Sequence, residues 1–130
     1  MSIDRNAALY GRVINWDDLQ REELRPGVRR AAYGTNEVML VMNELEAGMQ
    51  LNPHVHDDFD QLAYILEGEA DYYIGDEAHR MAPGSILLVP AGKHHHIQPT
   101  TARVLNLDIF VPPRADLLHL LEWIGPAPAT

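Results

Sequence analysis

Short runs of apolar residues, separated by turn-forming residues, fill the chain from Glu37 to Val111. The separating glycines and prolines recur at fairly regular intervals: Gly48, Gly68, Gly75, Pro83-Gly84 and Pro90-Ala91-Gly92. Short strands spaced in this way are typical of an antiparallel sandwich or barrel, and not of a fold built from β-α-β units. The dipeptide Gly75-Asp76 lies between two strand-like runs and predicts a tight hairpin.

The segments on either side of this region have other patterns. Residues 1–36 are weakly patterned and predict an N-terminal arm or edge segment, with a basic patch of unassigned role formed by Arg25, Arg29 and Arg30. Beyond the two prolines at 112 and 113, apolar residues recur at helical spacing, so residues 115–124 predict a C-terminal α-helix. We therefore divide the chain into an arm (1–36), a β-domain (37–113) and a helix with a frayed tail (114–130).

Composition and charge narrow the class of protein. A chain of 130 residues has the size of one domain, and its net charge of -9 is the wrong sign for a non-specific binder of nucleic acid or anionic membranes. The absence of cysteine excludes disulfides, thiolate metal sites and a cysteine nucleophile. No apolar run approaches the roughly 18 residues of a membrane span, and residues 1–16 lack the apolar core of a secretory signal. We expect a soluble, cytoplasmic protein.

Three histidines have a spacing that suggests a metal site. His54 and His56 are two residues apart, so on a strand both rings would project from one face. Gln61 follows five residues later, and His95 comes after a Pro-Ala-Gly turn. Three imidazoles and one oxygen ligand can hold a first-row divalent metal and leave coordination positions open. The plainer interpretation, in which these histidines only pack or face solvent, is the alternative.

The glycine framework around these histidines carries a family resemblance over residues 48–95. It resembles the two paired motifs of the cupin superfamily: Gly48-x5-His54-x-His56-x4-Gln61-x6-Gly68 and Gly84-x5-Pro90-x-Gly92-x2-His95. The resemblance implies an all-β domain, a double-stranded β-helix or jelly-roll barrel, whose metal ligands are His54, His56, Gln61 and His95. Two positions depart from the pattern, because Gln61 stands for the usual Glu and Pro99 for the usual Asn.

The neutral Gln61 changes the chemistry that such a site would support. A shell of three histidines and one glutamine leaves the full charge of +2 on a divalent metal, which makes the metal a stronger Lewis acid and attracts anionic substrates. The same shell suits high-valent iron less well. Asp60 would replace Gln61 if the strand register were shifted by one, although alternation favours Gln61. The ligands are compatible with nickel, zinc, iron, manganese or cobalt, so they leave the metal's identity open.

The remaining histidines are expected to have other roles. Alternation turns His94 and His96 away from the face of His95, toward the outside or the rim. His79 lies beside a hairpin turn and His119 lies on the expected helix. We predict that these four residues are not ligands.

The last strand of the β-domain has two different faces. Asn106, Asp108 and Phe110 share one face, and the other face is apolar, formed by Leu105, Leu107, Ile109 and Val111. Either the polar face meets water, or it lines a cavity while the apolar face packs against another element or subunit. Phe110 favours the cavity, because a large aromatic ring on a solvent face would be unusual.

The run from Leu107 to Asp116 resembles the end of small cupins that act on unsaturated uronates from pectin and alginate breakdown. The resemblance implies that the chain is a metal-dependent enzyme that opens and ketonises a 4,5-unsaturated uronate. In this assignment Arg114 binds the substrate carboxylate, Asp108 transfers a proton, and Phe110 forms an apolar wall. Each assignment has a plainer alternative, a surface arginine for Arg114 and a structural carboxylate for Asp108.

The predicted metal site is compatible with two other functions. A cupin site of this type can also hold Fe(II) in a dioxygenase, and the domain could be a non-catalytic sensor or sugar-binding module. The expected ligand is a small anionic sugar acid. Gln61, Ala63 and Ile65 should point inward, whereas Leu62, Tyr64 and Leu66 form a second, outward apolar face that predicts a homodimer.

Overall fold

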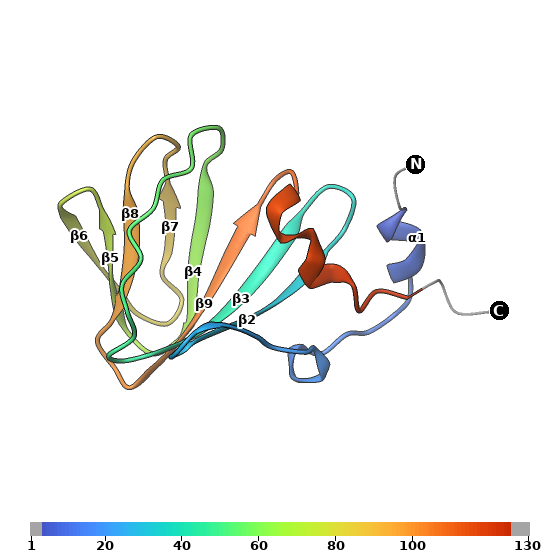
Figure 1. Cartoon of the computed structure of the whole chain (residues 1–130), viewed down its shortest axis with the longest axis horizontal. Coiled ribbons are helices and arrows are strands. Elements are labelled where there is room, and N and C mark those ends of the chain that lie inside the picture. Colours follow the sequence, from blue (N-terminus) through green and yellow to red (C-terminus); the bar gives the residue numbers. More distant parts are fainter. Residues whose placement is uncertain (1–3, 126–130) are drawn as a thin grey trace.

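The computed structural model describes residues 4–125, and strands dominate this part of the chain (Figure 1). The strands are β1 (Glu22–Arg25), β2 (Val28–Gly34), β3 (Met39–Glu46), β4 (Gln61–Glu67), β5 (Ala70–Ile74), β6 (Glu77–Met81), β7 (Ile86–Val89), β8 (His95–Pro99) and β9 (Arg103–Phe110). The helical segments are α1 (Arg5–Leu9) and two short 3-10 helices, η1 (Trp16–Asp18) and η2 (Ala115–Leu121). The all-β architecture expected from the turn spacing is confirmed.

The strands form two antiparallel sheets that share one core. One sheet has the order β1-β2-β3-β9-β4-β7 and the other has the order β6-β5-β8. Ala63 and Ile65 of β4 pack in one buried cluster with Ala70 and Tyr72 of β5, so the sheets pack together through their inner faces. The predicted hairpin is confirmed, because the two residues of Gly75-Asp76 connect β5 to β6 and Gly75 has a positive φ of 58°.

The N-terminal segment contributes more to the sheet than its pattern suggests. Residues 22–34, which we placed in an arm or edge segment, form β1 and β2, and β2 pairs with β3 along its whole length. On β2 the inward positions include Val28, Ala32 and the partly buried Arg30. A charged residue at an inward position breaks the apolar alternation by which a strand is recognised. The segment therefore looks weakly patterned although it is paired.

The C-terminal helix is shorter and of a different type than predicted. The expected α-helix over 115–124 is wrong, because Ala115–Leu121 is a 3-10 helix with bonds such as Leu117 N to Arg114 O at 3.1 Å. Its N-cap residue, Arg114, makes no side-chain capping bond, which leaves the first turn without the stabilisation that favours a longer α-helix. Leu117 and Leu121 are nevertheless buried, as the apolar spacing predicts. Most of the expected frayed tail, residues 126–130, lies outside the described residues.

An apolar face on the outside of the larger sheet is partly uncovered. Leu62 pairs with Ile109 and Leu88, and these residues lie on the face opposite the core. Leu88 is 58% exposed and Ile86, on the same strand, is 61% exposed. This is the face that the homodimer expected from the sequence would bury, and the dimer stays a prediction. Among the described residues, no helix is both long and apolar enough to span a membrane.

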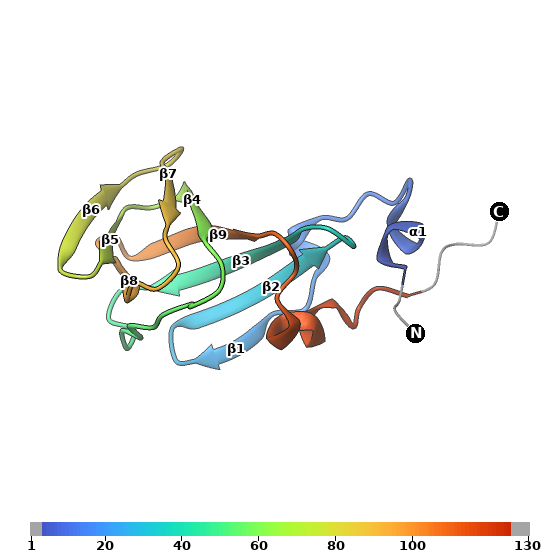
Figure 2. The same ribbon diagram turned by 90° about the horizontal axis from the view of Figure 1, so that it is seen from above.

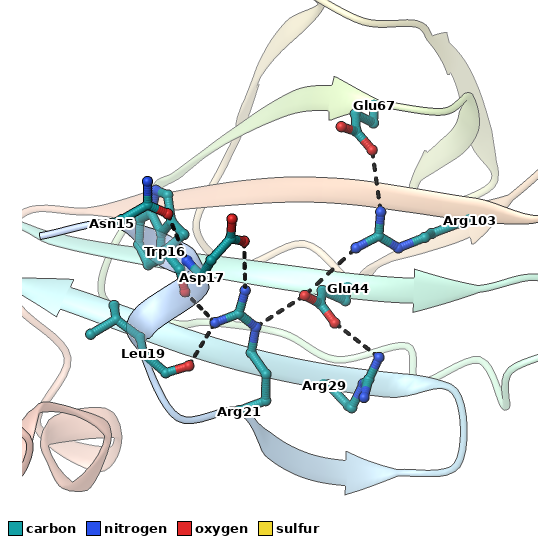
Figure 3. A network of polar contacts seen from close by, with 9 residues as sticks. All are labelled: Asn15, Trp16, Asp17, Leu19, Arg21, Arg29, Glu44, Glu67 and Arg103. Carbon is teal, nitrogen blue, oxygen red and sulfur yellow. Dashed lines mark hydrogen bonds and ion pairs between the residues drawn. The ribbon is translucent and has the colours of Figure 1, made fainter.

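Glu44 of β3 joins the N-terminal segment to the outer face of this sheet. Its carboxylate lies 3.0, 3.2 and 3.7 Å from the guanidinium nitrogens of Arg21, Arg29 and Arg103, respectively (Figure 3). Arg21 also donates to the backbone carbonyls of Trp16 and Leu19. The Glu44 side chain is only 11% exposed, so three arginines share one largely buried carboxylate.

We expect the Glu44→Gln substitution to lower the free energy of unfolding by about 1–3 kcal/mol, since it weakens the charge-assisted bond between two largely buried side chains, Glu44 and Arg21. Urea denaturation measures this change. Glu46→Gln is the matched control, because Glu46 is exposed at the end of the same strand and forms no ion pair within residues 4–125. Equal unfolding free energies for the two variants would contradict the prediction.

Candidate metal centre and its cavity

The segment that carries His54 and His56 is an extended loop. We expected both residues on a regular strand, but residues 47–60 connect β3 to β4 without strand structure except at one isolated bridge. In this bridge His54 N donates to His95 O at 3.0 Å and His95 N donates to His54 O at 2.8 Å. Two of the predicted ligands are therefore held together by their own backbones, one on the loop and one at the start of β8.

The three imidazoles converge. One ligand nitrogen from each of His54, His56 and His95 lies within 4.8 Å of the other two. The ring centroids are 4.2 Å apart for His54 and His95, and 5.0 Å apart for each of the other pairs. His95 is buried, His56 is half-buried and His54 is exposed, so the cluster opens toward solvent on the side of His54.

Backbone bonds orient two of these rings. Nδ1 of His54 lies 2.7 Å from Asn52 O, and Nδ1 of His95 lies 3.2 Å from Lys93 O. Because a carbonyl can only accept, each Nδ1 donates, and each Nε2 keeps a lone pair for a metal. Burial lowers the pKa of all three histidines, to about 4 for His95, which favours the neutral ligand form at pH 7.

Gln61 supplies an oxygen beside the cluster. Its side chain is 3% exposed, and its Nε2 lies 3.4 Å from the hydroxyl of Tyr72, while Oε1 has no hydrogen-bond partner. His56 Nε2 and His95 Nε2 are also buried without a partner. Unpartnered buried lone pairs are costly unless a cation occupies the site, so these donors fit a divalent transition metal. Asp60 points elsewhere, because its Oδ1 accepts from the Ala91 N–H at 2.8 Å.

Asp108 lies on the inner face of β9, as one of the two interpretations of that strand predicts. Asn43 Nδ2 donates to one carboxylate oxygen at 3.0 Å, and Asn106 Nδ2 donates to the other at 2.9 Å. Burial raises the pKa of Asp108 to about 6, and the two amide bonds oppose this rise without cancelling it. A carboxyl group with such a pKa can both accept and donate a proton near neutral pH.

The guanidinium group of Arg114 lies over two aromatic rings. Its guanidinium carbon lies 4.9 Å from the ring centroid of Phe110 and 5.5 Å from that of Phe59. Phe59 in turn stacks on His56 with centroids 4.6 Å apart. Nε and Nη2 of Arg114 bind the two carboxylate oxygens of Asp116 at 3.1 and 2.6 Å. The Nη1 side of the guanidinium has no protein acceptor among residues 4–125 and is available to a ligand.

These groups share one large cavity of about 1090 Å³. Its lining contains six of the seven residues predicted from the sequence: His54, His56, Gln61, Asp108, Phe110 and Arg114. The seventh, His95, lies buried behind the other two rings. The structure therefore brings all seven residues to one place.

Sequence reasoning missed several residues of this cavity. Phe59 lies on the irregular loop, where no periodicity marks it. Asn43 could have been found, because it is a polar residue between the inward-facing Val41 and Leu45 of β3. Tyr72, whose ring stacks near His95 with centroids 6.2 Å apart, lies at an inward position of β5.

The other histidines make contacts away from the cluster. His96 stacks on Tyr73 with centroids 4.6 Å apart and contributes to the cavity lining, and His94 is exposed. His79 contacts Glu77 and His119 contacts Glu22. None of these four histidines belongs to the cluster of three imidazoles.

Two antiparallel sheets around a cavity with convergent imidazoles define a small β-protein of the cupin class. A family model described as "Cupin domain" matches residues 41–110, and the chain belongs to this family. The match covers β3 to β9 and includes all four predicted metal ligands.

Similar proteins point to one branch of the family. The chain is 28% identical over 103 residues to the pectin degradation protein KdgF of Dickeya dadantii, covering 78% of this chain and 94% of that one. It also resembles the structure of KdgF from Halomonas sp., with a TM-score of 0.73, 26% identity and coverage of 80% and 97% of the two chains. An RmlC-like cupin from Shewanella frigidimarina has a TM-score of 0.71 at 22% identity, with coverage of 80% and 93%, and shows the same fold.

Proposed function

We propose that this cupin is a metal-dependent enzyme that opens the ring of 4,5-unsaturated uronates and ketonises them to linear 4-deoxy keto-uronates. The observation that carries the proposal is the buried Asp108 carboxylate, which shares a cavity with three convergent histidines and with Arg114. Similarity to a pectin degradation protein supports a sugar acid as the substrate class.

The metal would be held by His54, His56 and His95, whose ligand nitrogens converge, and by Gln61, whose Oε1 is buried without a partner. When bound, a divalent metal supplies a Lewis acid that polarises a ring or hydroxyl oxygen of the sugar. The identity of the metal is open, because nickel, zinc, iron, manganese and cobalt all accept such ligands.

Arg114 binds the carboxylate of the substrate and orients the ring. Its bond to Asp116 holds the guanidinium in place, and the free Nη1 side presents N–H groups to the anion. Phe110 and Phe59 form the apolar surface beneath the guanidinium, against which the sugar ring packs.

Asp108 moves the proton. Its carboxylate takes the proton of the anomeric hydroxyl as C1 becomes an aldehyde, the bond from C1 to the ring oxygen breaks, and that oxygen remains on C5 as an enolate. The carboxylic acid then returns the proton to C4, which leaves a ketone at C5. Atoms and electrons balance without an oxidant. Asn43 and Asn106 hold the carboxyl group in position throughout.

The proposal is tested with purified protein whose metal content is measured, by following the loss of ultraviolet absorbance of the C4=C5 bond in unsaturated galacturonate and mannuronate. We expect loss faster than in protein-free solution, with no oxygen consumed. Metal-loaded protein that does not exceed the protein-free rate would overturn the proposal. Oxygen uptake with a catechol or diketone would instead identify the Fe(II) dioxygenase, and tight sugar binding by metal-free protein without turnover would identify a binding module.

A further inference from the structure

One wall of the cavity comes from outside the region matched by the family model. The β1–β2 hairpin, residues 22–34, precedes the match at 41–110 and contributes Arg25 and Arg30 to the cavity lining. Figure 2 shows this hairpin at the edge of the larger sheet, beside the C-terminal helical segment. The proposed reaction uses neither arginine.

Arg30 is already neutralised. Its Nε and Nη2 lie 2.9 and 2.8 Å from Oε1 of Glu22, whose other oxygen contacts His119 Nε2 at 2.8 Å. The Arg30 side chain is 16% exposed. Its charge is therefore committed to a contact that ties β1, β2 and the C-terminal segment together.

Arg25 is not neutralised in this way. Its Nε donates to the backbone carbonyl of Gln50 at 3.1 Å, and no carboxylate within residues 4–125 forms an ion pair with it. Partial burial and the charge of Arg30 both lower the pKa of Arg25, so its cation occupies an unfavourable position. The two Nη groups have no protein acceptor among the described residues, and an anion in the cavity would satisfy them.

Arg25 and Arg114 enter the cavity from different elements. Arg25 ends β1, whereas Arg114 follows the end of β9. The charges of both guanidinium groups nevertheless act on the His54 ring, so both lie within electrostatic range of the candidate metal centre.

The whole chain has a net charge of -9 and so repels the anion that the cavity is proposed to bind. A local uncompensated cation counters this repulsion inside a cleft, where field lines are concentrated. We infer that Arg25 captures the carboxylate of an acidic sugar in this cavity and sets its preference for acidic over neutral sugars. This inference rests on the proposed function for its choice of a sugar acid. Arg25 is a binding residue that supplements Arg114, and neither arginine takes part in the proton transfer.

Calorimetric titration of the full-length protein with D-galacturonate and with D-galactose tests the inference. We expect wild type to prefer galacturonate, and Arg25→Gln to weaken galacturonate binding about tenfold while leaving galactose binding unchanged. Added salt should weaken galacturonate binding to wild type more than to the variant. Arg25→Lys keeps the positive charge but lacks the planar guanidinium, so its affinity for galacturonate should lie between those of wild type and Arg25→Gln.

Arg29→Gln is the matched control. Arg29 is the neighbouring arginine of the same hairpin, but it is exposed on the outer face and pairs with Glu44. This variant should bind galacturonate as wild type does. Wild-type affinity in Arg25→Gln, or no preference of wild type for galacturonate, would overturn the inference. Circular dichroism verifies that each variant is folded, and if Arg25→Gln is not, Arg25→Lys must still weaken binding for the inference to stand.

Kinetics separate this inference from the proposed function. If unsaturated uronates are turned over, Arg25→Gln should raise KM about tenfold and change kcat much less, because Arg25 holds the anion and takes no part in the proton transfer. If they are not turned over but galacturonate binding still depends on Arg25, the proposed reaction fails and the anion-binding role stands. If turnover occurs and the KM of Arg25→Gln is unchanged, the proposed reaction stands and the anion-binding role of Arg25 fails.

Discussion

Replacing Asp108 by asparagine lowers the turnover of an unsaturated uronate by about 10²–10⁴-fold, the usual contribution of a positioned acid or base. Asparagine has nearly the shape of aspartate, so the cavity keeps its form, but an amide cannot accept and return a proton. The metal content should stay at the wild-type level, because Asp108 is not among the three imidazoles and the glutamine that face one another. Steady-state absorbance assays and elemental analysis measure the two quantities on one preparation.

A control substitution at a second aspartate tests whether the effect of Asp108→Asn comes from the loss of proton transfer or merely from the loss of one negative charge. Asp71 of β5 binds Arg80 through its Oδ1 at 2.8 Å, in the smaller sheet, and does not line the cavity. Asp71→Asn should therefore turn over the substrate at the wild-type rate. Turnover near the wild-type rate in Asp108→Asn would disprove the role of this carboxyl group, whatever metal the protein holds.

Replacing His95 by alanine has the second large effect, the loss of bound metal. His95 is 1% exposed, and its Nε2 is buried without a hydrogen-bond partner. Since removing a mere hydrogen-bond partner of a ligand costs about 10–100-fold in metal affinity, removing the ligand itself should cost more than about 100-fold. Elemental analysis after dialysis, and competition with a chromogenic chelator, measure this loss.

His96 provides the comparison for His95. It is the next residue in the chain, and its ring stacks on Tyr73 and does not belong to the three convergent imidazoles. His96→Ala should keep the full metal content. A His95→Ala variant that retains metal at the wild-type ratio would show that the convergent imidazoles are not a metal site.

Alternation along regular strands predicted the inner faces of the cavity. On β9 it placed Asn106, Asp108 and Phe110 together, and on β4 it placed Gln61 beside the buried Ala63. This worked because side chains of a paired strand point to opposite faces with a period of two. The choice between cavity and solvent could not come from alternation, since both faces of β9 carry apolar residues.

Prediction failed where the chain leaves regular structure. His54 and His56 were assigned to a strand, but only the pair of bonds between His54 and His95 holds that loop segment to β8. Phe59 lies further along the same loop and could not be assigned to a face. The type of the helix over Ala115–Leu121 was also out of reach, because apolar spacing over so few residues fits a 3-10 turn as well as an α-turn.

The β1–β2 hairpin has a consequence for how such a protein could be redesigned. The residues that would hold a metal all follow position 41, whereas Arg25, which we infer to select acidic sugars, lies on a short antiparallel ribbon paired to the sheet along a single edge. Exchanging this ribbon between relatives would have to keep Val28 and Ala32, which pack in the core, and the contacts of Glu22 with Arg30 and His119. Grafting ribbons with different charges would then produce enzymes that share one reaction centre and select different sugars.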